Sequence, residues 1–289
     1  MPPRRLIPAD LVARWETELR KAVDSAISQM QREVNRVLRS SGHANLVAAG
    51  VKPVVSAGAA AQVWSNGSWR DAVNTHIAPV AAAVSKSATQ AARASIPASA
   101  TYGMDVSATQ GKIEKMLLDR AIASGEYLGE RLDGYLLTAP TPAMQVAQIV
   151  QFWNTASTIT GDVLGASATT AGGLAEADTT GYAAGQPGNG VSSATRSWVD
   201  AGDDRVRDGH HSDEVDDVGL NDPFIVNGEA LMCPGDPAGS DGNTINCRCT
   251  VETDGIPEGG SADGDFDSQL DAMLAEASQQ AQAMGGVPY

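Results

Sequence analysis

The residue types best suited to hold a metal ion lie in the last third of the chain. Its three cysteines are Cys233, Cys247 and Cys249, and His210 and His211 precede them. Thiolate and imidazole are the ligands that zinc prefers in closed tetrahedral sites. A zinc ion held in this way could stabilise a turn-rich segment that buries little apolar surface. We therefore take His210, Cys233, Cys247 and Cys249 as a candidate structural zinc set.

The two neighbouring thiols also admit a simpler interpretation. Cys247 and Cys249 are closer together in sequence than the two cysteines of a usual C-x-x-C knuckle. A strand is predicted over residues 245–252, and residues i and i+2 of a strand share a face. On that interpretation both cysteines are small, buried apolar side chains. The sequence leaves the metal site and the apolar interpretation open.

Arg207 and His210 are a second pair of residues that could bind a ligand or take part in catalysis. If residues 203–211 are helical, the two side chains share one face and could act as an anion-binding or catalytic pair. Because many acidic residues surround them, we favour a structural role, in which Arg207 pairs with a carboxylate and His210 fixes the turn. The acidic run over residues 213–217 lacks the spacing of a calcium-binding loop and is interpreted as a solvated loop. The sequence contains no phosphate-binding loop, nucleophile elbow or His-Glu-x-x-His string.

A long amphipathic helix is predicted over residues 9–40, near the start of the chain. Apolar residues recur every three or four positions from Leu11 to Val37, which is the helical period. On an isolated monomer this stripe would be a large exposed apolar surface. We therefore expect it to dock on a partner, with its first members as the main anchors: Leu11, Trp15, Leu19, Val23 and Ile27.

The rest of the N-terminal region has the same helical character. A second helix carries Trp69 and is expected to bend or split at Pro79. Further helices are expected over residues 107–124, from Thr141-Pro142 through Trp153, and over residues 162–185. Residues 1–187 are therefore predicted to form one helical region.

A turn-rich module follows over residues 195–254. Its clearest element is a β-hairpin, in which residues 224–226 and 229–231 flank the turn Asn227-Gly228. Residues 255–289 are expected to form an acidic, Gly-rich linker and a short C-terminal helix. The predicted fold class is mainly α, with a long-helix N-terminal region followed by a small α+β C-terminal module with a β-hairpin.

Charge is distributed unevenly along the chain. The net charge of −15 separates into +4 for residues 1–150 (16 Lys and Arg against 12 Asp and Glu) and −19 for residues 151–289 (4 against 23). An acidic half repels phosphates, so we expect no tight, specific DNA binding. The sequence shows neither a signal peptide nor a membrane-spanning apolar run, so we expect a protein made in a reducing cytoplasm that does not contact a membrane.

The C-terminal module contains one ordered set of motifs. The set begins with Trp198 and continues with Asp204-Arg205-Val206-Arg207, His210, Pro234-Gly235-Asp236-Pro237 and Asn246-Cys247-Arg248-Cys249. In this order the motifs resemble a known family, the Mu F-like phage head-morphogenesis proteins. Many members carry His-Pro directly before the Asn-Cys-Arg-Cys string, where this chain has Thr244 and Ile245, so no metal role carries over from that His. The positions that match the family motif are Trp198, Asp204, Arg207, His210, Pro234, Asp236, Asn246, Cys247, Arg248 and Cys249.

The resemblance implies a minor capsid protein of a tailed phage, made in the host cytoplasm. Such a structural, non-enzymatic protein lies in the virion, inside the head at or near the portal vertex. It acts in head morphogenesis, DNA packaging or DNA ejection. The expected partners are the portal protein, the major capsid protein or further copies of this chain.

A zinc-dependent hydrolase or nuclease is the alternative function. It would be built on His210, the cysteines and the acidic cluster. An enzyme of this kind needs an open metal position and a general base in a cleft.

Overall fold

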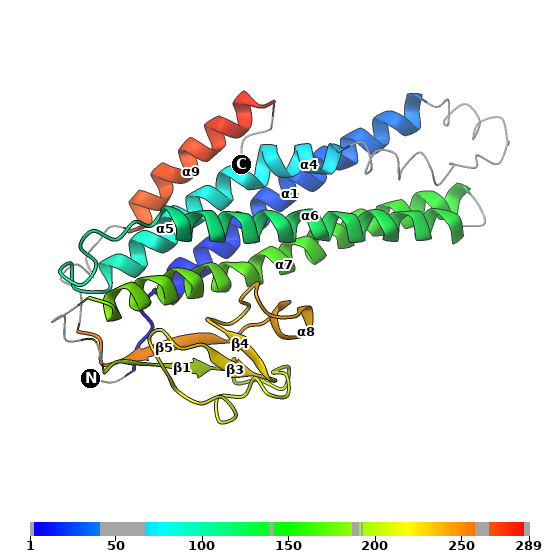
Figure 1. Cartoon of the computed structure of the whole chain (residues 1–289). Coiled ribbons are helices and arrows are strands. Elements are labelled where there is room, and N and C mark those ends of the chain that lie inside the picture. Colours follow the sequence, from blue (N-terminus) through cyan, green and yellow to red (C-terminus); the bar gives the residue numbers. More distant parts are fainter. Residues whose placement is uncertain are drawn as a thin grey trace. The chain divides into compact units, whose positions relative to one another are not determined.

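A computed structural model of the chain describes residues 3–40, 67–138, 142–186, 191, 193–257 and 266–285 (Figure 1). Helices dominate these residues, and short antiparallel strands lie toward the C-terminus. This arrangement confirms the predicted fold class, mainly α with a small α+β module. None of the helices described here combines the length and the apolar character that a membrane crossing needs.

The chain divides into two compact units. The first contains Met1–Glu18, Ala81–Leu117 and Gly165–Glu276, and the second contains Leu19–Val80, Leu118–Leu164 and Ala277–Tyr289. This division does not follow the predicted boundary between residues 187 and 195. The C-terminal module belongs to the same unit as the end of the preceding helix, because the two are packed together. For example, the Thr253 hydroxyl donates to the Glu176 carboxylate at 2.8 Å.

Helix α1 spans Ala9–Ser40, the predicted range. Its apolar stripe is buried within the chain, with exposed fractions of 5% or less for Leu11, Trp15, Leu19, Val23 and Ile27. In the first unit, the Trp15 indole donates to the hydroxyl of Ser87, in helix α5 (Ala78–Ala94), at 3.1 Å. The expectation of an exposed docking stripe was therefore wrong for this structure, because segments distant in the sequence cover it.

The predicted break at Pro79 takes the form of a π-helical turn. Helix α4 (Ser68–Ala72) continues into η1 (Val73–Ile77) and then directly into α5. In a regular helix the ring of proline collides with the carbonyl four residues earlier. The wider turn relieves this collision, and the backbone N–H of Ala78 bonds to the oxygen of Val73, five residues before it.

Helices α6 (Ser107–Thr138) and α7 (Pro142–Ala184) both run further than predicted. In the second unit, α6 continues through Gly125, next to the predicted end of a helix at residue 124. A Cβ atom on Gly125 would lie 1.8 Å from the indole nitrogen of Trp69, which donates to the Ala121 oxygen at 2.9 Å. This glycine therefore makes room for an indole ring and does not end a helix.

The C-terminal module contains a three-stranded antiparallel sheet. Strand β1 (Thr195–Val199), which the sequence analysis did not predict, lies between β2 (Val218–Gly219) and β5 (Thr250–Asp254). The strand predicted over residues 245–252 begins only at Thr250, so the two cysteines of the C-x-C string lie before it.

The predicted hairpin is confirmed as a separate two-stranded sheet. It consists of β3 (Phe224–Val226) and β4 (Glu229–Leu231). The turn residues Asn227 and Gly228 have φ values of 50° and 81°, as a type I′ turn requires. The short helix α8 (Asp241–Thr244) follows this hairpin.

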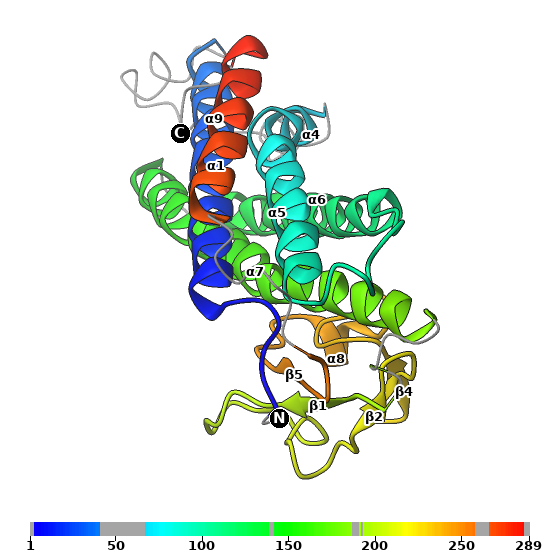
Figure 2. The ribbon, with the colours of Figure 1, turned by 90° about the vertical axis from the view of Figure 1, so that its left-hand side faces the viewer.

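Two terminal segments complete the first unit. The backbone of Arg4 forms two hydrogen bonds with Thr253, of 3.0 and 2.8 Å, and so extends the sheet beside β5. Helix α9 (Phe266–Ala283) begins alongside the first turns of α1, where Arg14 forms ion pairs with Asp267, at 2.7 Å, and with Asp271 (Figure 2).

Candidate metal centre

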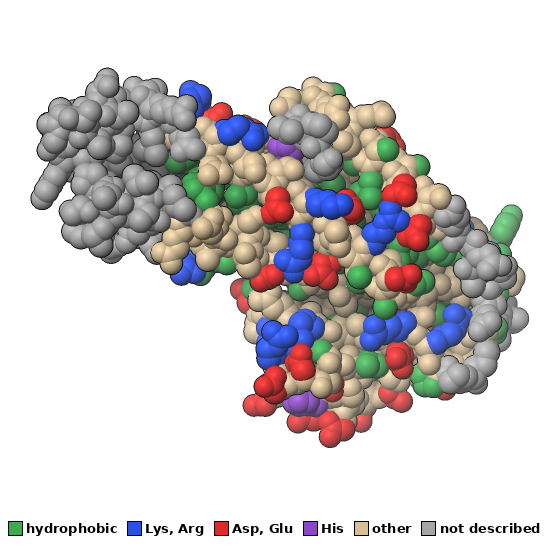
Figure 3. All heavy atoms as spheres, turned by 180° about the vertical axis from the view of Figure 1, so that it is seen from behind, with side chains coloured by type: hydrophobic (Ala, Val, Ile, Leu, Met, Phe, Trp, Pro, Cys, Tyr) green, Lys and Arg blue, Asp and Glu red, His purple; other side chains and the backbone are tan. Residues whose placement is uncertain are grey.

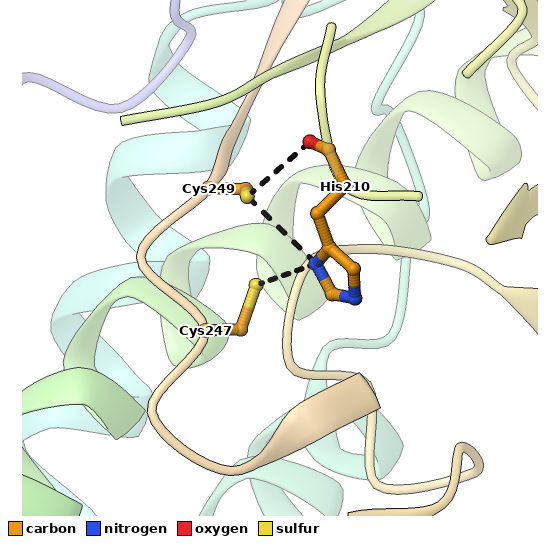
Figure 4. Close-up of side chains that lie close together, drawn as sticks. All are labelled: His210, Cys247 and Cys249. Atoms are coloured by element: carbon orange, nitrogen blue, oxygen red, sulfur yellow. Dashed lines mark hydrogen bonds between the residues drawn. The ribbon is translucent and has the colours of Figure 1, made fainter. Parts of the chain in front are cut away.

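Three of the four proposed ligands meet in the C-terminal module. The donor atoms of His210, Cys247 and Cys249 all lie within 4.8 Å of one another (Figure 4). His210 Nδ1 is 3.7 Å from the sulfur of Cys247 and 4.0 Å from that of Cys249. The three residues are buried, with exposed fractions of 1%, 5% and 4%. Such a group of soft donors could hold a metal ion.

Cys233 does not belong to this group, which corrects the predicted set of four. It is buried beside helix α7, where a Cβ atom on Gly173 would lie 2.8 Å from the Cys233 Cβ. Its sulfur is therefore used in packing between the module and the helix. Within the described residues, His210, Cys247 and Cys249 are the group of at least three His, Cys, Asp or Glu residues that could share an ion.

Strand β1 supports His210 through Trp198. The buried indole of Trp198 donates to the main-chain oxygen of His210 at 3.0 Å. The two rings meet edge to face, with centroids 5.6 Å apart, and Phe224 packs against the indole in the same way at 5.5 Å. Trp198 therefore fixes the backbone that carries the imidazole.

The imidazole is oriented by a residue that the sequence analysis missed. Asn243 Oδ1 lies 3.2 Å from His210 Nε2. The amide nitrogen of Asn243 donates to the Val226 oxygen at 3.3 Å, and its Oδ1 also accepts from Asn227 at 3.0 Å. No spacing rule in the sequence distinguishes Asn243 from the other Asn residues of the module.

Two arginines form hydrogen bonds that hold the loops around the cysteines in place. Arg248 binds the carboxylate of Asp203 through two hydrogen bonds of 2.5 and 2.6 Å, and this guanidinium holds the pKa of Asp203 well below its usual range. Arg207 donates to the main-chain oxygen of Ile245. The predicted carboxylate partner for Arg207 is therefore replaced by a carbonyl. Residues 203–211 form turns and no helix. Arg207 and His210 therefore do not share a helical face, which the hypothesis of an anion-binding or catalytic pair required.

The remaining motif residues do not belong to the group of three candidate ligands. Asp236 accepts from the backbone N–H groups of Met232 and Ala238, at 2.7 and 2.9 Å, and so fixes the turn after β4. Pro234 is buried in that turn, and Asp204 is exposed. Asn246 occupies the left-handed region, with φ 56°, directly before Cys247.

The two thiols of the C-x-C string have different proton affinities. A hydrogen bond from Cys249 lowers the pKa of Cys247, against the opposing effect of burial and with a smaller contribution from His210. The same bond and burial raise the pKa of Cys249. The two thiols therefore share a proton between them, and a metal ion, which binds thiolates, would compete for it.

Comparison with known proteins gives no match: no family model, no curated protein and no solved structure is similar to this chain. The interpretation of the site therefore depends on its own chemistry. Two sulfurs and one imidazole nitrogen, buried and close together, favour a soft or borderline ion over calcium or magnesium, which prefer oxygen ligands.

Proposed function

We propose that this chain is a minor capsid protein of a tailed phage, located inside the head near the portal vertex. In this proposal it acts in head morphogenesis or in DNA packaging and ejection, and one zinc ion stabilises its C-terminal module. The observation that carries the proposal is that four of the motif residues meet in one buried centre. Trp198, His210, Cys247 and Cys249, which carry the family resemblance, form this centre, and Arg248 fastens its outer loop.

Burial favours a structural zinc over a catalytic one. Catalytic zinc keeps a coordination position open to substrate, whereas structural zinc is closed to solvent. His210 is 1% exposed. One pocket of the first unit is lined by other residues, among them Ile7, Gly172 and Val251, and by none of the three ligands.

The hydrolase or nuclease alternative has one observation in its favour. Three protein ligands leave a fourth position, as in catalytic zinc sites. Cleavage of nucleic acid by the zinc-loaded chain, and loss of that cleavage in His210→Ala, would support this alternative. A chain that binds zinc without cleaving DNA or RNA would support the structural role.

The charge distribution also fits a role that does not depend on tight DNA binding. Residues 151–289 carry −19, and on the face shown in Figure 3 Lys and Arg side chains are interspersed with Asp and Glu. A protein that neutralises many phosphates needs a continuous basic surface. We expect contacts with portal or capsid protein to position this chain in the head.

Quantitative mass spectrometry of purified virions tests the placement. We expect the chain at low copy number relative to the major capsid protein, and enriched in fractions that retain the portal. Absence from both proheads and mature particles would contradict the proposal. Sampling both particle types distinguishes a protein that acts only in assembly from one that never enters the head.

A further inference from the structure

We infer that Asn243 is a positioning residue of the metal centre, which selects the Nε2–H tautomer of His210 and directs its Nδ1 lone pair at the two sulfurs. The inference rests on the proposed metal site and adds a residue outside both the ligand set and the family motif. Asn243 lies in α8, has an exposed fraction of 5%, and places its Oδ1 3.2 Å from His210 Nε2.

The orientation of the Asn243 amide is determined by its other partners. Its nitrogen can only donate, and it faces the main-chain oxygen of Val226, at 3.3 Å, and the carboxylate of Glu229. Its oxygen can only accept, and it also receives the Asn227 amide at 3.0 Å. A flipped amide would lose these bonds. The atom facing His210 is therefore an acceptor, so Nε2 must carry the proton.

A neutral imidazole has one protonated nitrogen, so the other nitrogen carries the lone pair. With Nε2 protonated, that nitrogen is Nδ1, which lies 3.7 and 4.0 Å from the sulfurs of Cys247 and Cys249. Metal-binding histidines generally donate their second N–H to a fixed acceptor, which orients the ring and sets the tautomer. Asn243 supplies that acceptor here, and the Trp198 bond to the His210 oxygen fixes the backbone.

Two substitutions separate this role from simple packing. Asn243→Asp keeps an acceptor for His210 Nε2 but loses the amide donor to Val226 and Glu229, whereas Asn243→Leu loses both the acceptor and the donor. If Asn243 acts through His210, Asn243→Leu lowers zinc affinity by about 10- to 100-fold, and Asn243→Asp retains most of the affinity. If Asn243 acts only by holding the hairpin at Val226, the two variants bind zinc with equally reduced affinity, and the inference fails.

The tautomer is measured directly in the full-length chain, labelled with ¹⁵N, by long-range ¹H–¹⁵N correlation of the His210 ring. In the metal-free protein at a pH where His210 is neutral, we expect a protonated Nε2 and an unprotonated Nδ1. After addition of zinc alone, we expect the shift change of metal binding at Nδ1. A protonated Nδ1, or zinc bound through Nε2, would overturn the inference.

These measurements also distinguish the inference from the proposed function. If zinc does not bind, the metal site fails, while the tautomer of the metal-free protein still tests the role of Asn243. Should Asn243→Leu not fold, the Asp variant and the tautomer measurement on the unmodified chain decide the question.

Discussion

The Trp198 indole donates to the main-chain oxygen of His210 at 3.0 Å, while its ring meets the imidazole edge to face. One side chain therefore holds both the backbone and the ring of a metal-ligand candidate. Trp198 reaches this position because β1 pairs along its full length with β5, where Trp198 is opposite Val251. The same pairing brings the Cys249 end of the C-x-C string next to the loop of His210.

Trp198→Phe should destabilise the module more than its small change in apolar area suggests. The variant keeps a ring beside Phe224 but removes the indole donor to the buried oxygen of His210, which then has only the weak thiol donor of Cys249, at 3.9 Å. Loss of the indole hydrogen bond costs about 0.5–1.5 kcal/mol of unfolding free energy. Urea unfolding followed by far-UV circular dichroism measures the change. Tyr102→Phe, at a side chain that is 84% exposed, is the control and should leave stability unchanged. Equal stability of Trp198→Phe and the unmodified chain would contradict the prediction.

Replacement of single cysteines should separate ligands from packing residues. Cys247→Ala and Cys249→Ala are each expected to reduce bound zinc from about one equivalent to a small fraction, because each removes one of three clustered donors. Cys233→Ala should retain the metal, since Cys233 packs against α7 at Gly173. Elemental analysis after anaerobic purification gives the stoichiometry. Loss of zinc from a folded Cys233→Ala variant would return Cys233 to the ligand set.

Glu176 should make the first unit more stable in mild acid than at alkaline pH. Burial raises the pKa of Glu176 from 4.5 to about 7, against the lowering effects of the Thr253 hydroxyl, Arg196, the Leu6 backbone and Arg4. Between these two values the folded chain holds a proton that the unfolded chain releases. The free energy of unfolding therefore falls as pH rises through this window, by about 3 kcal/mol in total from this group.

Glu176→Gln tests this dependence, because glutamine keeps the shape without the titration. Thermal or urea unfolding at intervals from pH 4.5 to 8 should show a smaller decline in stability for the variant than for the unmodified chain. Asp216→Asn, at an exposed acid of the same unit, controls for the loss of one negative charge. Parallel pH profiles for Glu176→Gln and the unmodified chain would show that Glu176 stays ionised throughout.

Two glycine-to-alanine substitutions should change the stability of the protein in opposite directions. A Cβ at Gly173 would approach the Cys233 Cβ to 2.8 Å, so Gly173→Ala should lower stability by about 1–3 kcal/mol through overpacking. Gly111 in α6 has no atom within 4 Å of its added Cβ, so Gly111→Ala should raise stability by about 1 kcal/mol. Both are measured by urea unfolding. Stabilisation by both changes would mean that the module does not pack on α7 at this point.

The sequence by itself determined the elements whose signals are local. The helical period from Leu11 to Val37 predicted α1 over its full range, because periodicity depends only on neighbours a few residues away. The Asn227-Gly228 turn predicted the β3–β4 hairpin for the same reason, since only a few residue types tolerate its positive φ values. The motif residues identified the region of the candidate site, and residue chemistry indicated the metal class.

Only the tertiary structure decided which of these residues meet. The α1 stripe is core and not a docking surface, because whether an apolar face is covered depends on segments far along the chain. The group that could hold a metal ion contains Cys247 and Cys249 but not Cys233, because His210 reaches the former across 37 and 39 residues of chain. Asn243 emerged as a partner of His210 in the same way. The packing of helices and strands sets the distances between side chains. A sequence pattern predicts such a distance only where the contacting residues are close in sequence.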